Sequence, residues 1–271
     1  MKLGAVLGTY SGITLAGTAG SSWLTSDGGA ALFDGTPSRR ARLKWPTVAP
    51  LTSHTVAISA TSASVPVGAM ALLNTTLPVG LKVEFRVYSG AAIAASGVAM
   101  IAVHGDTRGS WWIAPSNTTG NKIEVVIYND VSGAIGLTSG GAYDLGEIVA
   151  AAVFEIDAER EWKDLVIDPS SNSRNRASRN FRNAKKPYRQ LTMPLAAEGV
   201  AKVRGNGLGN GYDWDQIRWL FASGFGAVCV PRTTSTSEVQ RTAVFGMAAL
   251  EDFEHRGGDY YTSSLTFEQI P

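Results

Sequence analysis

The strongest concentration of like charge in the chain is a group of cations with no acidic residue between Pro169 and Ala197. Its seven members are Arg174, Arg176, Arg179, Arg182, Lys185, Lys186 and Arg189. A block of like charge attracts phosphate or carboxylate surfaces. A nucleic-acid module would carry a basic helix or stacking aromatics among its cations, but only Phe181 and Tyr188 lie nearby. We therefore predict contact with an acidic neighbouring subunit. The alternatives are a solvated loop and the binding of nucleic acid or an anionic surface polymer.

A second cluster combines aromatic rings with polar side chains, the residue types from which glycan sites are built. It consists of Trp111, Trp112, His104, Asp106 and Arg108. Adjacent residues in a strand point to opposite faces of the sheet. We therefore expect one of the two tryptophans to be exposed for a glycan and the other to belong to the core.

Patterns that would indicate catalysis or metal binding are missing. None of His54, His104 and His255 has a second histidine or a cysteine at ligand spacing, so we predict no metal site. Nucleophile-elbow and P-loop motifs are absent, and the glycines from Gly205 to Gly211 depart from the dinucleotide-binding spacing. A glycosidase needs two carboxylates facing each other, and the acidic pair Glu251 and Asp252 has the pattern of a solvated strand face. The sequence predicts neither an enzyme nor a cofactor.

Bulk composition indicates a sheet protein with many turns. The chain has 271 residues, of which 44% are hydrophobic, 17% are charged and 30 are glycine. The net charge of +1 gives no reason to expect nucleic acid or an anionic membrane as a partner. The one cysteine, Cys229, allows no intrachain disulfide and is expected to be a small buried side chain. No apolar stretch reaches the roughly 18 residues of a membrane-spanning helix, and no signal peptide is recognised, so we expect synthesis in a cytoplasm without membrane insertion.

Period-two alternation of apolar residues predicts strands in the first half of the chain. Val83, Phe85 and Val87 alternate with polar residues in the segment 82–88, and the segment 122–128 repeats this arrangement. Further strands are predicted at 54–58, 92–103, 110–113 and 147–156. Because turn residues separate these short strands, we predict an antiparallel β-sandwich of the jelly-roll type over residues 1–157.

The composition changes after Asp157, and residues 158–271 are predicted to form a small α+β domain. Its basic loop, 169–187, is expected to be a long loop or an extended hairpin. Asp213 is a good N-cap with Gln216 three residues later, and Gly224 can end the resulting helix. Strands are predicted at 162–168, 188–195, 226–231, 241–254 and 260–269.

Two stretches of the first half resemble galactose-binding-like jelly-roll domains of the discoidin type. The segment Leu32-Phe33-Asp34-Gly35-Thr36-Pro37-Ser38, followed by Arg42-Leu43-Lys44-Trp45, is similar to the turn near the start of that fold. Leu145-Gly146-Glu147-Ile148 resembles its closing strand. The resemblance implies that loops at one end of the barrel bind sugars or lipids. Those loops cannot be matched residue by residue, so no ligand residues carry over.

The second half resembles tail and baseplate proteins of long-tailed bacteriophages. The similar features are the basic loop, the Tyr188-Arg189-Gln190-Leu191 strand, the Gly224-Phe225-Gly226 turn and the ending Ser263-Ser264-Leu265-Thr266-Phe267-Glu268. In distal tail proteins an accessory sandwich follows a ring-forming domain, whereas here the sandwich comes first.

This second resemblance implies a structural component of a virion tail tip that contacts copies of itself, other tail proteins and a host surface glycan. Two alternatives are a stand-alone carbohydrate-binding module and a hydrolase of cell-wall polymer.

Overall fold

The computed structural model describes residues 1–17, 20–47, 55–104, 107–129, 135–156, 162–174 and 180–270, with the backbone alone at 173, 174, 180, 181 and 196. The chain is mainly β, which confirms the predicted fold class. Contacts divide it into two compact units. The first unit contains Met1–Phe154 and Val230–Ala243, and the second contains Glu155–Cys229 and Val244–Pro271.

The main sheet of the first unit is antiparallel and has the order β11-β5-β9-β6-β7, with β1 beside β11, β2 on β5 and β8 on β9. The bounds of these strands are β1 Lys2–Ala5, β2 Ser11–Gly17, β5 Thr55–Leu73, β6 Lys82–Ser89, β7 Ala92–Met100, β8 Ala102–His104, β9 Thr107–Tyr128 and β11 Glu147–Glu155. A smaller sheet contains β3 Ser22–Trp23, β4 Ala41–Lys44 and β10 Ala142–Leu145, and a 3-10 helix covers Ala30–Phe33.

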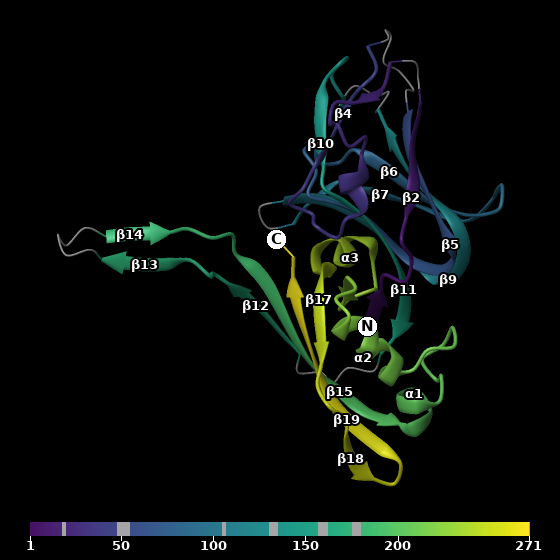
Figure 1. Ribbon diagram of the computed structural model, residues 1–271, viewed down its shortest axis with the longest axis vertical. Coiled ribbons are helices and arrows are strands. Elements are labelled where there is room, and N and C mark those ends of the chain that lie inside the picture. The colour runs from purple at the N-terminus through teal and green to yellow at the C-terminus, as the bar shows by residue number, and fades with distance from the viewer. Residues whose placement is uncertain are drawn as a thin grey trace. The chain divides into compact units, whose positions relative to one another are not determined.

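Two long strands carry both layers of this unit. The sequence predicts only short pieces of them, but β5 has 19 residues and β9 has 22. Both curve in Figure 1, and their pairing shifts register between Thr61 and Val65. The first half of β5 pairs with β2 and the second half pairs with β11. Each long strand therefore serves both halves of a sandwich, and side chains from both halves share one core.

The predicted alternation on β6 is confirmed. Val83, Phe85 and Val87 are all fully buried in the core. Across this core, Trp112 at the start of β9 lies against β7, because a Cβ at Gly97 would come within 1.8 Å of its indole nitrogen. Only a glycine leaves room for the ring at position 97, so the two layers of the sandwich are in contact through Trp112 and Gly97.

The two stretches that resemble the galactose-binding-like fold come together around one buried carboxyl group. The backbone N–H of Gly35 donates to Oε1 of Glu147 at 3.2 Å, so the early turn is joined to the closing strand. Glu147 is buried, and its Oε2 has no hydrogen-bond partner among the described residues. Burial raises the pKa of Glu147 to about 8, and the nearby negative charge of Asp34 adds to this rise.

The sheet of the second unit has the order β12-β15-β19-β17-β16, with β18 paired to β19. The bounds are β12 Lys163–Ile167, β15 Tyr188–Gly199, β16 Ala227–Val230, β17 Val244–Leu250, β18 Glu254–Gly257 and β19 Tyr260–Gln269, with helices α1 Val200–Arg204 and α2 Trp214–Ala222. Helix α2 packs on β17, and the unit's core includes the fully buried Leu191, Trp214 and Phe267. The predicted helix and its stop at Gly224, where φ is +80°, are confirmed.

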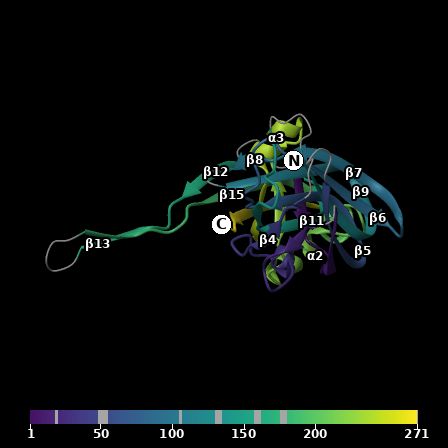
Figure 2. The ribbon, with the colours of Figure 1, turned by 90° about the horizontal axis from the view of Figure 1, so that it is seen from above.

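The basic segment forms an extended hairpin that projects from the sheet of its own unit (Figures 1 and 2). Strands β13 Ser171–Arg174 and β14 Asn180–Asn183 pair with each other and with no other described strand. They continue the pair formed by β12 and β15. Of the two predicted arrangements, the structure therefore shows the extended hairpin, which we call the arm (described residues 163–174 and 180–189).

The predicted strand at 241–254 is wrong over its first residues. Helix α3 covers Thr236–Thr242, and β17 begins only at Val244. The hydroxyl of Ser235 accepts a hydrogen bond from the N–H of Glu238, which is an N-cap that the sequence analysis did not recognise. This helix lies in the range predicted for the second domain, yet it packs on β9 and β8 of the first unit.

The buried carboxyl group predicts a pH dependence of stability. The pKa of Glu147 is about 8 in the folded chain against an ordinary value of 4.5, so the unfolded chain releases this proton at lower pH. The free energy of unfolding should therefore fall as pH rises through the window from 4.5 to about 8. In Glu147→Gln most of this dependence should disappear. Urea unfolding at several pH values measures it, with the exposed Glu251→Gln as control, and an unchanged slope in Glu147→Gln would contradict the assignment.

Candidate functional site

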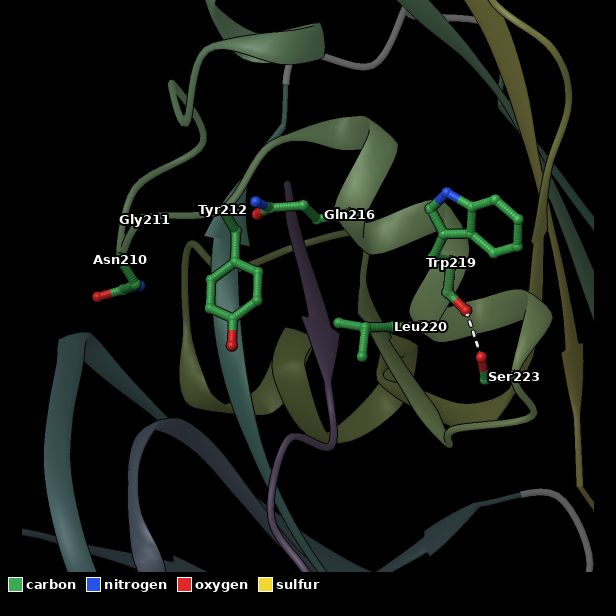
Figure 3. Close-up of a pocket in the computed structure, with 7 residues that line it drawn as sticks. All are labelled: Asn210, Gly211, Tyr212, Gln216, Trp219, Leu220 and Ser223. Atoms are coloured by element: carbon green, nitrogen blue, oxygen red, sulfur yellow. Dashed lines mark hydrogen bonds between the residues drawn. The ribbon is translucent and has the colours of Figure 1, made fainter.

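A surface hollow of about 550 Å³ lies beside α2 in the second unit. Helix α2 and the turn before it supply the lining (Figure 3), which consists of Asn210, Gly211, Tyr212, Gln216, Trp219, Leu220 and Ser223. The dominant feature is Trp219, whose relative exposure is 75%. Tryptophan is highly buried on average, so an indole left this open indicates a contact surface.

The capping box at the start of α2 determines which way Trp219 points. The N–H of Gln216 donates to Oδ1 of Asp213 at 3.0 Å, and the N–H of Asp213 donates to Oε1 of Gln216 at 3.3 Å. From this start, Ile217 and Phe221 lie on the buried face of the helix. Residues advance by about 100° along a helix, so Trp219 faces solvent when those two face the core.

The turn on the other side of the hollow depends on left-handed backbone conformations. Asn210 has φ of +52° and Gly211 has φ of +79°, which asparagine and glycine tolerate better than other residues. The N–H of Tyr212 donates to the carbonyl of Gly209 at 3.0 Å and closes the turn. Figure 3 shows that the ring of Tyr212 and the amide of Asn210 lie across the hollow from Trp219.

The chemistry of the hollow is that of recognition. It offers an indole, a phenol ring and the side-chain amides of Asn210 and Gln216, an apolar surface with a few polar groups. Among the described residues that line it there is no carboxylate, imidazole or thiol. The general acid and nucleophile that a hydrolase requires therefore have no candidate in this hollow.

The predicted aromatic cluster is not an open surface. Trp111 is only 2% exposed, and its backbone N–H and carbonyl are bonded to the amide of Gln240 on α3 at 3.1 and 2.6 Å. Of the two tryptophans, Trp111 therefore belongs to the core and Trp112 is half-buried. Trp112 lies over Gly97 on the core side, and α3 packs on the same strand.

The polar members of that cluster do not gather around an open ring. Arg108 is exposed, and its guanidinium donates to the carbonyl of Leu77 at 3.3 Å. His104 is half-buried, with its carbonyl accepting the hydroxyl of Thr107 at 3.0 Å. Asp106 lies outside the described residues.

The arm carries fewer unpaired cations than its sequence suggests. Arg189 bonds both oxygens of Asp164, with the shorter contact at 2.6 Å, and Arg182 bonds Asp168 at 3.0 Å. These carboxylates precede the basic segment, and strand pairing folds them back onto it. Arg176 and Arg179 lie outside the described residues, and only the backbone of Arg174 is described.

A second hollow, of about 410 Å³, lies at the base of the arm. Lys185 and Lys186 line it together with Pro169, Tyr188, Glu268 and Gln269. Lys185 is exposed and Lys186 is half-buried. The seven predicted contact cations therefore lie in three different settings: paired with aspartate, beside this hollow, or outside the side chains that the structure describes.

The outward face of β6 and β9 carries a polar network. The sequence predicts the two similar strand segments but not the contacts between their polar side chains. Arg86 lies at the centre of this network, and its guanidinium donates to Glu124 at 3.0 Å and to Glu84 at 2.8 Å. The hydrogen bond from Arg86 lowers the pKa of Glu84.

The two similar strand segments give this network an approximate two-fold symmetry. The hydroxyl of Tyr88 donates to Glu124 at 2.9 Å, and the hydroxyl of Tyr128 donates to Glu84. Lys122 lies over the ring of Tyr88 and Lys82 over that of Tyr128, each at 4.4 Å. The network joins neighbouring strands, and Arg86 pairs with both of its carboxylates.

The described part of the chain contains neither a cluster of metal ligands nor a membrane-spanning helix. No group of three or more histidine, cysteine, aspartate and glutamate side chains is placed to hold a metal ion. None of the described helices has the length and apolar content needed to cross a membrane.

Comparison with known proteins gives a weak structural likeness. No protein-family model and no curated protein matches the chain. Among solved structures, the chain is similar to the family 32 carbohydrate-binding module from C. perfringens NanJ in complex with galactose. The TM-score is 0.36 and the identity 13%, over 56% of this chain and 99% of that chain. A likeness at this TM-score carries no argument about the function of this chain.

The capping box predicts a link between helix stability and the shape of the hollow. Asp213→Ala removes one side of the reciprocal hydrogen bonds and should lower the free energy of unfolding by roughly 1 kcal/mol. Because Gln216 then loses its partner, the environment of the Trp219 ring should also change. Urea unfolding and tryptophan fluorescence measure the two effects. Asp252→Ala, which removes the exposed partner of Arg218 on the same helix, is the control. Equal stability of Asp213→Ala and the parent chain would contradict the role of the cap.

Proposed function

We propose that this chain is a carbohydrate-binding protein that holds a saccharide in the hollow beside α2. The observation that carries the proposal is the 75% exposure of Trp219 at the rim of a hollow with polar groups. An indole is a broad apolar surface against which the C–H face of a sugar ring can lie, and its burial against a ligand is favourable.

The polar lining supports an uncharged hydroxyl-bearing ligand. The amides of Asn210 and Gln216 are exposed and can donate to or accept from sugar hydroxyl groups. The side-chain oxygen of Gln216 already accepts the N–H of Asp213 in the capping box, so this amide is held in place before a ligand arrives. A volume of about 550 Å³ suits a mono- or disaccharide.

Removing the indole should remove most of the binding. Trp219→Ala should weaken saccharide affinity by at least about tenfold, because buried aromatic anchors dominate such contacts. Isothermal titration with a panel of neutral mono- and disaccharides measures this change. Tyr260→Ala, which removes an aromatic side chain with 54% exposure elsewhere in the second unit, is the matched control. Unchanged affinity in Trp219→Ala would reject the site, and no binding to any saccharide by the parent chain would reject the function.

A second candidate function is a structural component of a bacteriophage tail tip or baseplate, which assembles through the arm. The observation that favours it is the exposure of apolar side chains on β12, where Leu165 is 47% and Val166 is 75% exposed. β12 is an edge strand of its sheet, and an exposed apolar edge strand can pair with another chain. On this proposal, Lys185 faces an acidic surface of a neighbouring copy or of another tail protein.

Assembly through the arm should depend on its charge. The triple variant Arg182→Glu, Lys185→Glu and Lys186→Glu should lose any ring or higher-order particle while keeping the circular dichroism spectrum. Negative-stain electron microscopy and light scattering provide the measurement. The matched control is a triple variant with lysine or arginine exchanged for the other at the same positions. Normal particles in the glutamate variant would reject this contact, as would a parent chain that forms no particle.

A further inference from the structure

Strand β7 is an unprotected edge of the main sheet in the first unit. The strand order ends at β7, which pairs with β6 on one side and with no other described strand. Its outer backbone donors and acceptors therefore lack a strand partner among the described residues. Native proteins usually protect such an edge with charge, proline or a covering segment, because it templates pairing with another chain.

Charged residues and proline, two of the usual forms of edge protection, are absent from the sequence of this edge. From Gly90 to Val103 the chain has no acidic residue, no lysine, no arginine and no proline. β7 has one register shift against β6, between Val87 and Tyr88, near one end of the strand. The rest, including the pairing from Lys82 opposite Met100 to Val87 opposite Ala95, is regular.

The outward face of β7 adds an exposed apolar row to the free edge. Ile93, Val98 and Met100 are 50%, 48% and 50% exposed, and of these Val98 and Met100 lie in the regular part of the strand. On the inward face, Ala99 is buried in the core and Gly97 lies under Trp112. β7 therefore packs on the core through its inward face, whereas its edge and its outer face are exposed.

The other edge of the same sheet differs in the properties that matter for pairing. β2 also lacks charge, but its fully exposed side chains are small, such as Thr14 and Ala16. Its pairing with β5 is interrupted by a register shift between Ser11 and Thr14. Of the two edges, β7 has both the longer regular strand and the large apolar side chains.

We propose that β7 pairs antiparallel with β7 of a second copy of this chain, so that two sheets join into one across a two-fold axis. An antiparallel contact between identical strands is self-complementary, because each copy presents the same donors and acceptors in reversed order. A charge-free strand brings no like charges opposite each other in such a pair. With the axis at Val98, this residue lies opposite Val98 of the second copy, and Met100 lies opposite Ser96 of the second copy.

The charges next to β7 on the outer face are few. They lie on β6, where Arg86 pairs with Glu84, and where Lys82, opposite Met100, lies over the ring of Tyr128. β7 itself brings no charge to the contact with a second copy. A strongly charged strand of another protein would meet no opposite charge on β7, so electrostatic attraction would not favour it as the partner.

A single lysine on the edge tests the pairing. In Val98→Lys, two ammonium groups would face each other across the axis, so the dissociation constant of the dimer should rise by at least about tenfold. Sedimentation velocity of the full chain over a concentration series measures this change. Val79→Lys is the matched control, since Val79 lies in a turn of the same unit with 46% exposure. A monomeric parent chain, or a dimer that Val98→Lys leaves intact, would overturn the proposal.

Cross-linking tests the identity of the partner strand. Cys229 is fully buried and burial raises the pKa of its thiol to about 12, so a cysteine introduced at Val98 is the one reactive thiol. Mild oxidation should link two copies of Val98→Cys and leave Val79→Cys unlinked. A dimer that Val98→Lys dissolves but Val98→Cys fails to link would show that another strand, such as β2, is the partner, and would overturn self-pairing. Repeating the measurement in the arm triple variant separates this contact from assembly through the arm.

Discussion

The reciprocal hydrogen bonds between Asp213 and Gln216 are the interaction on which the candidate site depends. They fix where α2 begins, and the helical repeat then fixes the direction of every later side chain on it. Because Ile217 and Phe221 are buried in the core, Trp219 on the opposite side of the helix faces solvent. The same cap holds one end of Gln216 at the rim of the hollow. A few local hydrogen bonds therefore place both the aromatic surface and a polar group of the proposed ligand site.

Much of the fold follows from periodicity and from turn chemistry. The alternation around Phe85 predicts a half-buried strand, and the N-cap at Asp213 predicts α2, because both signals are local. Helix α3 was missed, since its cap at Ser235 precedes a short segment without a clear apolar stripe. The lengths of β5 and β9 are not predicted from the sequence. Each strand serves both layers of the sandwich, so the residues at its bend do not alternate between one buried and one exposed face.

The site residues were harder to predict than the elements that carry them. The cluster around Trp111 and Trp112 is predicted from aromatic rings beside polar residues, but this pattern does not show how far a second layer covers the two rings. The overlooked signal was Trp219, an aromatic residue on the polar side of an amphipathic helix. The sequence likewise does not show that Arg189 and Arg182 have aspartate partners, because Asp164 and Asp168 come to them only through strand pairing.

The central claim is that a saccharide lies against the ring of Trp219. Titrating isotope-labelled chain with galactose and other neutral sugars, while following the indole N–H resonances of the seven tryptophans, tests it most directly. The indole resonance of Trp219 should shift and saturate, together with the side-chain amides of Asn210 and Gln216. The buried Trp214, in the same helix, should stay in place. A saturating shift elsewhere with Trp219 unmoved, or no shift with any sugar, would contradict the account.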